Sequence, residues 1–502
     1  MTQQPLTLEL WSPELPRDFV VTRFTGFEAM SECFDFALEF TRGDEEVDVE
    51  ACLRPGTRAA ISFKRNEEIV RVMHGCLVEF GAQTSHEEPE QHVAHTRWFA
   101  RFAPRVWNSK LSIRTEVYEG SPREILTEVL QRSGLYPEID FEFRLVDDYP
   151  RREFVLQYHE SDYAFISRLL EHWGIAFTFE HGTRDRLIFS DQNAALLDIA
   201  CWKRPEEAGD SDAPENPGAE RDHVTTLPYR QYAGGEGAGG SSVASHSWCT
   251  KRVPASFMTH DYNYRLPHVR LEAECQVLAA GDGRVVEHGL HLKAPAESAH
   301  FARIRAELLG INRVLHQGTT SSLELRAGGS FSLFPDPDGN ETRLLVHRVE
   351  HRLREGYSAR FHALPLEVAY RPALLTPKPR IAGYLSGVVQ GDDAAQPNID
   401  DQGRYQVALD CDSKQPGERC LGRPMRMLQM HAGPNYGMHF PLKPGTEVAV
   451  GFMNGDPDRP FIAGALPNPL TPSPVRGERG NARRNVIQSM SGVQIELDDG
   501  NA

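Results

Sequence analysis

The segment His347-Arg348-Val349-Glu350-His351 has the spacing of a known zinc-binding motif. It reads HxxEH, the inverted zinc-protease pattern, which requires both histidines on one face of a helix. The surrounding residues instead alternate between apolar and polar types, which predicts a strand. On a strand, His347 and His351 would lie about 13 Å apart at about 3.3 Å per residue, with Glu350 on the opposite face. We therefore keep a zinc hydrolase only as the weakest alternative.

Two further groups could bind a metal ion by residue type alone. Three histidines flank the loop at 86–92, namely His86, His92 and His95, and four acids surround a turn, namely Asp400, Asp401, Asp410 and Asp412. Histidines and acids in surface loops are usually solvated, so we expect a metal at neither group.

No motif for nucleophilic or phosphate chemistry is found in the sequence. Ser489, Ser491 and the other serines lack the GxSxG surroundings of an activated nucleophile. The glycine-rich segment 234–240 has no Lys-Ser or Lys-Thr after it, as a phosphate loop would require. We therefore expect no catalytic, cofactor-binding or metal-binding residues, and a protein that is not an enzyme.

The charge and the hydropathy of the chain narrow the choice of partners. The 502 residues contain 54 basic and 71 acidic side chains, a formal net charge of −17, which disfavours nucleic acid and anionic lipid. The sequence has no run of about 18 apolar residues and no signal peptide at its start, so we expect synthesis into the cytoplasm. The eight cysteines have no CxxC spacing, and we expect free thiols.

Two regions of alternating apolar and polar residues predict two β-barrels. The first barrel is expected from strands at 6–40, 58–82 and 92–106. The second is expected from strands that begin near residue 245 and end at 357–370. Two segments rich in glycine, proline or acidic residues, 205–222 and 232–242, predict surface loops.

Three helices are expected between the barrel strands. For the first, Ser121 is the predicted N-cap, Pro122 the first helical residue and Glu124 the partner in a capping box. The second is expected to begin at 160–163 and to end at Trp173-Gly174. The third is expected over about 296–315, with four apolar residues on one side: Phe301, Ile304, Leu308 and Leu309.

Beyond the second barrel, a proline-rich linker leads to a smaller β domain. Residues 371–380 carry three prolines and predict an extended, stiff connection. The following segment has the size of a five-stranded OB-type barrel, with a turn at 400–404 and a hairpin built on Val448, Val450 and Phe452.

Two long stretches of this sequence resemble VgrG-type tail spike proteins of type VI secretion, which are related to contractile phage tail hubs and spikes. One stretch includes GMHFP at 437–441, PGTEV at 444–448 and GDPDRP at 455–460, and the other is FVLQYHESDYAFISRLLEHWGIAFTFEH at 154–181. The chain departs from the family pattern at 425–432 and at Leu442-Lys443, which changes the outward contacts expected of the barrel.

The resemblance implies a mainly β (α+β) fold: two hub β-barrels with inserted helices, an OB-type β-barrel, and the start of a trimeric β-prism or β-helix. The corresponding domains are a phage-hub-like domain at 1–372, a proline-rich linker at 373–384, an OB-fold domain at 385–470 and the start of the spike at 485–502. Only about fifteen residues separate the OB barrel from the spike, too few for an enzyme domain such as the lysozyme of a phage spike.

The tail carries its own argument for self-association. Val493, Ile495 and Leu497 place apolar side chains on one face of a strand, and a lone strand or hairpin is barely stable in water. We therefore expect this tail to pair with copies of itself. Because similar proteins continue beyond this point, we expect that the sequence ending at Ala502 is either a piece of a longer spike or an unusually short one.

The resemblance implies a structural function in a contractile injection machine. A homotrimer would cap an inner tube of Hcp-like protein, contact baseplate proteins, carry a PAAR-like tip protein and effectors, and touch the target membrane only on ejection. The chain would be cytoplasmic during assembly and then secreted. The alternative is an OB-fold module that binds nucleic acid or sugar, for which Arg423, Arg426 and Tyr436 are the candidates; the acidic charge argues against it.

Overall fold

The computed structural model describes residues 6–15, 19–41, 52–85, 95–194, 225–230, 241–279, 281–354, 356–416, 418–419, 421–422 and 424–500. Contacts divide the chain into two compact units. Unit 1 consists of residues 1–112, 122–149 and 161–377, and unit 2 consists of residues 113–121, 150–160 and 378–502. The predicted loop at 205–222 and residues 232–240 of the predicted loop at 232–242 lie outside the described residues.

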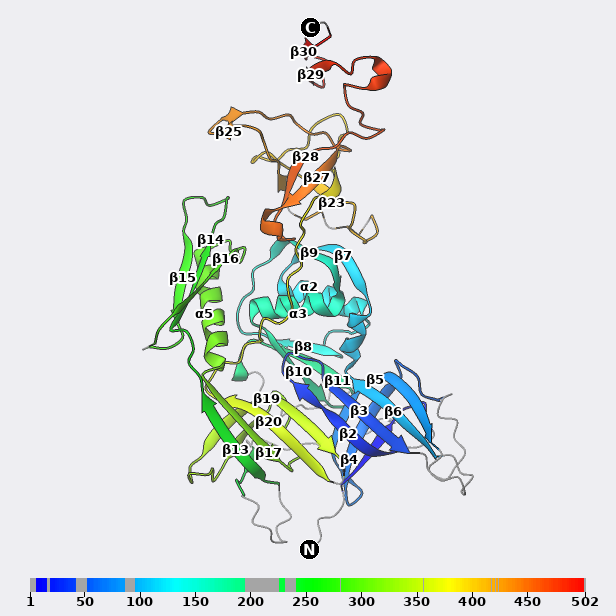
Figure 1. Ribbon diagram of the computed structural model, residues 1–502, viewed down its shortest axis with the longest axis vertical. Coiled ribbons are helices and arrows are strands. Elements are labelled where there is room, and N and C mark those ends of the chain that lie inside the picture. Colours follow the sequence, from blue (N-terminus) through cyan, green and yellow to red (C-terminus); the bar gives the residue numbers. More distant parts are fainter. Residues whose placement is uncertain are drawn as a thin grey trace. The chain divides into compact units, whose positions relative to one another are not determined.

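The first barrel of unit 1 is a closed ring of antiparallel strands (Figure 1). Its order is β1-β4-β5-β6-β3-β2, and β1 pairs with β2 to close the ring. Alternate residues point inward and bury phenylalanines such as Phe24, Phe36 and Phe63. The predicted first barrel is therefore confirmed, with these strands: β1 (Leu6–Trp11), β2 (Phe19–Ala29), β3 (Asp35–Thr41), β4 (Arg58–Arg65), β5 (Glu68–Ser85) and β6 (His95–Ala103).

The second barrel of unit 1 shares a seam with the first, because β2 pairs with β19. Its strands follow the order β13-β17-β20-β19-β18-β12, and a bridge between Tyr229 and Val243 links the two ends of this row. The second predicted barrel is thus also confirmed, with these strands: β12 (Thr225–Leu227), β13 (Val243–Thr250), β17 (Val314–Thr320), β18 (Ser330–Leu333), β19 (Thr342–Leu353) and β20 (Tyr357–Pro365).

The helices and small sheets of unit 1 are inserted between barrel strands. A 3-10 helix η1 (Arg105–Lys110) follows the first barrel. One sheet contains β8 (Phe141–Arg144), β10 (Ala176–His181) and β11 (Asp185–Ser190), and a second contains β14 (Ser256–Asp261), β15 (Leu271–Gln276) and β16 (Arg284–His288). The helices are α2 (Pro122–Arg132), α3 (Asp162–Trp173) and α5 (Pro295–Ile311).

The predicted first residue of the first helix and both predicted ends of the second helix are confirmed. Pro122 is the first residue of α2, and Ile125, Val129 and Leu130 are buried. The hydroxyl of Ser161 accepts a hydrogen bond from the Ala164 N–H at the start of α3, and Gly174 ends that helix in the left-handed region at φ 70°.

The third helix differs from the prediction in length and in its buried face. It ends at Ile311, because the following residues pair as β17 with β13 and β20 instead of continuing the helix. Phe301 and Ile304 are buried as expected, but Leu308 and Leu309 are only half-buried. The helix packs on α3, where the rings of Phe301 and Trp173 lie 5.1 Å apart.

Unit 2 is built around the OB-type barrel. Four strands pair in the order β23-β21-β27-β28, a two-stranded sheet joins β22 to β24, and a bridge from Met427 to Ile462 connects the two sheets. The predicted hairpin is β27 with β28, and Gly403 takes the left-handed conformation in the predicted turn at 400–404. The strands are β21 (Leu385–Val389), β22 (Arg404–Tyr405), β23 (Val407–Leu409), β24 (Met425–Arg426), β27 (Glu447–Phe452) and β28 (Pro460–Ala465).

Unit 2 also contains two strands that lie far from the OB segment in the sequence. β7 (Ile113–Gly120) pairs with β9 (Arg152–Ser161), and we call this two-stranded sheet the β7–β9 ribbon. A short hairpin of β25 (Ala432–Gly433) and β26 (Tyr436–Gly437) projects from the barrel. The 3-10 helices η3 (Met453–Gly455) and η4 (Gly477–Arg479) connect the remaining strands.

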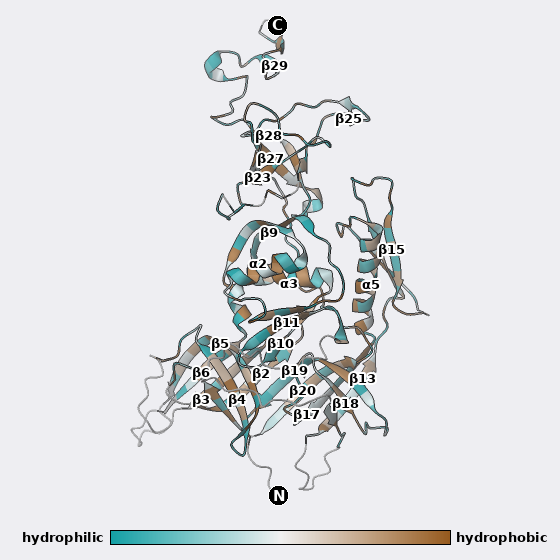
Figure 2. Cartoon of the chain, turned by 180° about the vertical axis from the view of Figure 1, so that it is seen from behind, coloured by the Kyte–Doolittle hydropathy of each residue, from teal (hydrophilic) through white to brown (hydrophobic). Residues whose placement is uncertain are grey.

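The tail forms a hairpin, whereas the sequence predicted a single strand. β29 (Arg484–Gln488) pairs with β30 (Gln494–Asp498), and Ile487 lies opposite Ile495 on the apolar face of the hairpin. In Figure 2, hydrophobic residues alternate with hydrophilic ones along the barrel strands. Among the described residues, the structure contains no helix long and apolar enough to cross a membrane.

Candidate functional site

The HxxEH segment lies on strand β19, as its alternating pattern predicted. Its register shifts between Val346 and Arg348, so His347 occupies a β-bulge and the regular alternation is interrupted at the first residue of the motif. The Glu350 carboxylate lies 3.4 Å from Nε of Arg348. The Glu350 side chain is thus paired within its own strand, and this geometry does not support a zinc hydrolase.

His351 belongs to a buried polar group at the seam of the two barrels. Its Nε2 lies 3.0 Å from the Glu28 carboxylate, and its Nδ1 lies 2.7 Å from the Tyr357 hydroxyl. A neutral imidazole satisfies both contacts, with Nε2–H donating to Glu28 and Nδ1 accepting from Tyr357. Burial lowers the pKa of His351, although Glu28 opposes this effect.

Arg71 completes the same group from the first barrel. Its Nη2 lies 2.7 Å from Glu28, and its Nη1 donates to the carbonyls of Leu323 and Leu325. Burial would raise the pKa of Glu28, but Arg71 and His351 together hold it well below the ordinary value. The group joins strands of both barrels by charge-assisted hydrogen bonds.

His347 lines a cavity on the outside of the second barrel. The cavity has a volume of about 720 Å³, and its lining includes His316, His362, Tyr370 and Arg371. Burial, with smaller contributions from His362 and Arg348, lowers the pKa of His347 to about 4. The imidazole is therefore neutral at pH 7.

The two other groups considered for a metal ion consist of loop and turn residues, of which the structure describes His95 and the four aspartates. Asp400 accepts hydrogen bonds from the N–H groups of Gln402 and Arg404, so it stabilises its own turn. Asp412 is buried and accepts from the Lys414 N–H. His86 and His92 lie outside the described residues, and His95 begins β6. Within the described ranges, no cluster of three or more His, Cys, Asp or Glu side chains could hold a metal ion.

Of the residues considered for an OB binding face, the structure describes Arg426 and Tyr436. Arg423 lies outside the described residues. Arg426 faces Arg404 across the β22–β24 pair, and Tyr436 lies in the short projecting hairpin, 59% exposed. The structure therefore gives the nucleic-acid or sugar alternative no further support.

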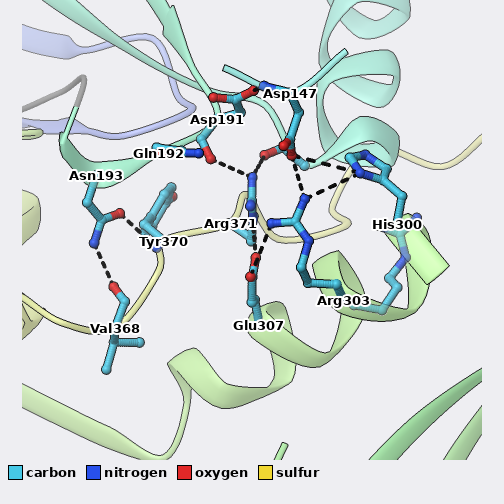
Figure 3. A network of polar contacts seen from close by, with 12 residues as sticks. Asp147, Asp191, Gln192, Asn193, His300, Arg303, Glu307, Val368, Tyr370 and Arg371 are labelled. Carbon is cyan, nitrogen blue, oxygen red and sulfur yellow. Dashed lines mark hydrogen bonds and ion pairs between the residues drawn. The ribbon is translucent and has the colours of Figure 1, made fainter. Parts of the chain in front are cut away.

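A dense polar network holds the chain where it leaves the second barrel (Figure 3). Arg371 donates through Nη1 to the carbonyl oxygens of Gly174 and Asp191, at 2.9 and 2.8 Å, and its Nε lies 2.6 Å from Glu307 of α5. Asn193 donates to the Val368 carbonyl and accepts from the Tyr370 N–H. We call these contacts the exit clamp.

The exit clamp extends into the predicted linker. Thr376 donates to the Glu171 carboxylate through both its N–H and its hydroxyl, at 2.8 and 2.7 Å. Leu375 between these anchors is 72% exposed. Sequence reasoning missed the clamp because its members are spread from Glu171 to Thr376 and share no local motif.

The tail hairpin exposes apolar side chains on one face. Ile487 and Ile495 are cross-strand partners and are 49% and 60% exposed, while Leu497 is 64% exposed. Val493 beside them is 70% exposed. An isolated hairpin with an uncovered apolar face is only marginally stable in water.

A match to a family model shows to which protein family the chain belongs. The model described as "Phage tail baseplate hub (GPD)" matches residues 27–357, which is more than half of the sequence. The chain belongs to the phage tail baseplate hub family. The matched range covers most of both barrels of this hub protein. A second model, described as "Type VI secretion system/phage-baseplate injector OB domain", matches residues 387–466.

Relatives of the hub protein include named spike proteins. It is 27% identical over 480 residues to "Actin cross-linking toxin VgrG1" of Vibrio cholerae. The aligned region covers 89% of this chain and 40% of the relative. It is 26% identical over 482 residues to "Type VI secretion system spike protein VgrG1c" of Pseudomonas aeruginosa, which covers 91% of this chain and 61% of the relative. The hub protein thus spans about half the length of these relatives.

Solved structures share the fold. The E. coli c3393 protein, described as a component of the type VI secretion system with structural similarity to T4 tail proteins gp27 and gp5, matches with a TM-score of 0.61 and 23% identity, over 91% of this chain and 99% of that one. A chain of the half-lidded Francisella PdpA-VgrG complex matches with a TM-score of 0.59 and 9% identity, over 99% of this chain and 84% of that one. The mainly β hub fold is therefore shared across distant sequences.

Proposed function

We propose that this chain is the hub and the beginning of the spike of a contractile injection machine of the type VI kind. Three copies would form a homotrimer that caps the inner tube and is driven outward with its cargo. The observation that carries the proposal is the order within one chain: two hub-family barrels, an injector-type OB barrel, and a hairpin with an uncovered apolar face.

The two barrels support a match to a six-fold tube. Each barrel is a row of six strands, and the two share the β2–β19 seam. Three chains would therefore present six similar barrels, which suits a hexameric ring of Hcp-like tube protein. We propose baseplate proteins, a PAAR-like tip protein and effectors as the other partners.

The proposed action is mechanical. A spike under thrust requires large intersubunit interfaces, and burial of apolar surface supplies them without a reaction centre. Glu28, Arg71 and His351 contact one another at the seam of the two barrels, and His347 lines a cavity. We therefore propose that the residues of this chain act as a scaffold, secreted through the apparatus after assembly in the cytoplasm.

The trimer proposal is tested by changing one face of the tail hairpin. Ile487 and Ile495 face each other across the strands, and the neighbouring pair Gln488 and Gln494 points to the opposite face. The double change Ile487→Ser/Ile495→Ser is expected to lower the fraction of trimer measured by light scattering. The matched change Gln488→Ser/Gln494→Ser is expected to leave it unchanged, and equal effects of both pairs would contradict the proposal.

The delivery proposal is tested in cells that carry the cognate machine. An epitope-tagged chain is expected in the medium of cells with an intact contractile sheath and absent from the medium of sheath-deletion cells. Equal release from both strains, with a cytoplasmic marker as the lysis control, would contradict the proposal.

A further inference from the structure

The β7–β9 ribbon is part of the core of the OB barrel. Three of its side chains, Val117, Phe154 and Leu156, are at most 3% exposed and belong to one hydrophobic cluster with barrel residues. The barrel members of this cluster include Ile381, Val389, Tyr405, Val407, Leu409, Met425, Val448, Val450 and Ile462. The barrel core is therefore completed by strands from more than 200 positions earlier in the chain.

An aspartate of the GDPDRP segment holds one edge of the ribbon. The Asp458 carboxylate accepts a hydrogen bond from the Leu156 N–H at 2.9 Å and is 8% exposed as a residue. Lys378 Nζ lies 2.6 Å from both Asp456 and Asp458. A buried carboxylate stabilised by a cation and a backbone donor is a directional contact, which fixes the register of the ribbon on the barrel.

The other strand of the ribbon is held by the segment after β23. The Ser413 N–H donates to the Thr115 carbonyl at 2.9 Å, and its hydroxyl donates to Glu116 at 3.0 Å. The ammonium of Lys414 lies 4.1 Å from the centroid of the Tyr118 ring. Both strands of the ribbon thus have polar as well as apolar contacts to the barrel.

A close approach of the backbone at Gly422 fits the ribbon specifically. Gly422 has φ +61°, and a Cβ added there would lie 2.7 Å from Cδ2 of Phe154 and 3.0 Å from the Glu153 carbonyl oxygen. Only a residue without a side chain at position 422 allows the ribbon to lie so close to the backbone there.

We propose that the β7–β9 ribbon is the docking element for the OB barrel, and that Asp458 is its positioning residue. Because the chain passes between the two units at residues 112/113, 121/122, 149/150, 160/161 and 377/378, the proline-rich linker is one of five covalent connections. This step rests on the proposed function of the chain as a spike. Under thrust, force then reaches the spike through the β7–β9 ribbon, which is packed into the core of the OB barrel. The linker alone does not carry the load.

The proposal is tested by cutting only the linker. A recognition sequence for a site-specific protease is inserted after Leu374, which is 49% exposed and lies between the anchors Arg371 and Thr376. After cleavage of the purified full chain, the fragment that begins at the cut no longer has a covalent bond to the ribbon. We expect the two fragments to elute together from a size-exclusion column in native buffer and to separate in denaturant.

Separation of the two fragments in native buffer, with both still folded by circular dichroism, would overturn the proposal. If one fragment associates only with its own copies, it does not hold the other fragment in the same elution peak. Co-elution or separation of the two fragments is therefore independent of the oligomeric state. A mass of one copy of each fragment in the shared peak would contradict the trimer while leaving the docking proposal intact.

Substitutions then identify the contacts that hold the cleaved chain together. Phe154→Ala with Asp458→Asn is expected to increase the dissociation of the cleaved fragments at least tenfold. The matched control is Phe334→Ala with Asp410→Asn, because Phe334 is 50% exposed in unit 1 and Asp410 is exposed. Equal dissociation of the test and control variants would overturn the role given to Phe154 and Asp458, and the uncut variants show whether each chain folds.

Discussion

The Glu28 carboxylate on β2 lies 3.0 Å from Nε2 of His351 on β19, across 323 positions of sequence. β2 belongs to the first barrel and β19 to the second, so this contact stands at the seam that joins them. Arg71 on β5 contacts the same carboxylate, and Tyr357 on β20 contacts the same imidazole. The two barrels are therefore joined inside the seam as well as along its strand edges.

Removing the charge at Glu28 should weaken this seam strongly. Glu28→Gln leaves Arg71 buried without its anion, and breaking a buried ion pair in this way costs about 3–5 kcal/mol. We expect a loss of that size in the free energy of unfolding, measured by urea denaturation. Glu39→Gln is the control, because Glu39 forms an exposed pair with Arg23 and such pairs contribute about 1 kcal/mol or less. A similar loss in both variants would contradict the seam interpretation.

Together with His347 of the cavity, the group at the seam predicts that acid destabilises unit 1. The pKa of His347 is lowered to about 4 and that of His351 is lowered by burial, so the unfolded chain takes up protons first as the pH falls below about 6.5. The folded pKa of Glu28 is also lowered, so its contribution is complete above about pH 4.5 and is lost below it. We expect the urea midpoint to fall between pH 7 and pH 4. His347→Gln should reduce the part of that slope between pH 6.5 and pH 4, and an unchanged slope would contradict this assignment.

Two glycines with similar backbone angles should respond differently to alanine. Gly134 and Gly174 both have positive φ, but an added Cβ meets nothing within 4 Å at Gly134 and lies 2.5 Å from Cγ2 of Ile304 at Gly174. Gly134→Ala is expected to cost about 1–2 kcal/mol from backbone strain alone. Gly174→Ala should cost about 1–3 kcal/mol more, because α5 must move away. Equal thermal unfolding temperatures of the two variants would show that the α3–α5 contact is not tight.

Loss of the guanidinium at the exit clamp should loosen the start of the linker. Arg371→Met removes the contacts to Glu307 and to two carbonyl oxygens, for an expected cost of about 3 kcal/mol. We also expect faster limited proteolysis near Leu375. Arg360→Met, at an exposed position on β20, is the control and should change stability by about 0.5 kcal/mol or less. Unchanged proteolysis of Arg371→Met would argue that the linker is held by Thr376 alone.

The local signals in the sequence predicted much of the fold. Ser161 and Gly174 ended α3 as expected, because capping depends on neighbouring residues, and the period-two pattern at 347–351 correctly favoured a strand over a zinc helix. The prediction for the tail lacked strand β29, because Arg484–Gln488 is short and mostly polar. The third helix was predicted to be longer than it is. Val314–Thr320 pairs with strands that are distant in the sequence, and the neighbouring residues give no signal of that pairing.

The functional contacts between distant segments could not be predicted in this way. Nothing near Phe154 indicates that its ring completes a barrel built from residues after 380. In the same way, the role of Asp458 depends on the backbone of Leu156, about 300 positions away. Such contacts follow from the folded topology, and a single sequence without its structure does not contain a signal for them.

The mass of the purified chain in solution tests the central claim most directly. Light scattering across at least a hundredfold range of concentration should give three times 56.4 kDa, about 169 kDa, with no decline on dilution. This result would agree with a trimeric hub whose apolar tail faces are covered by its own copies. A mass of 56.4 kDa at every concentration would contradict the account.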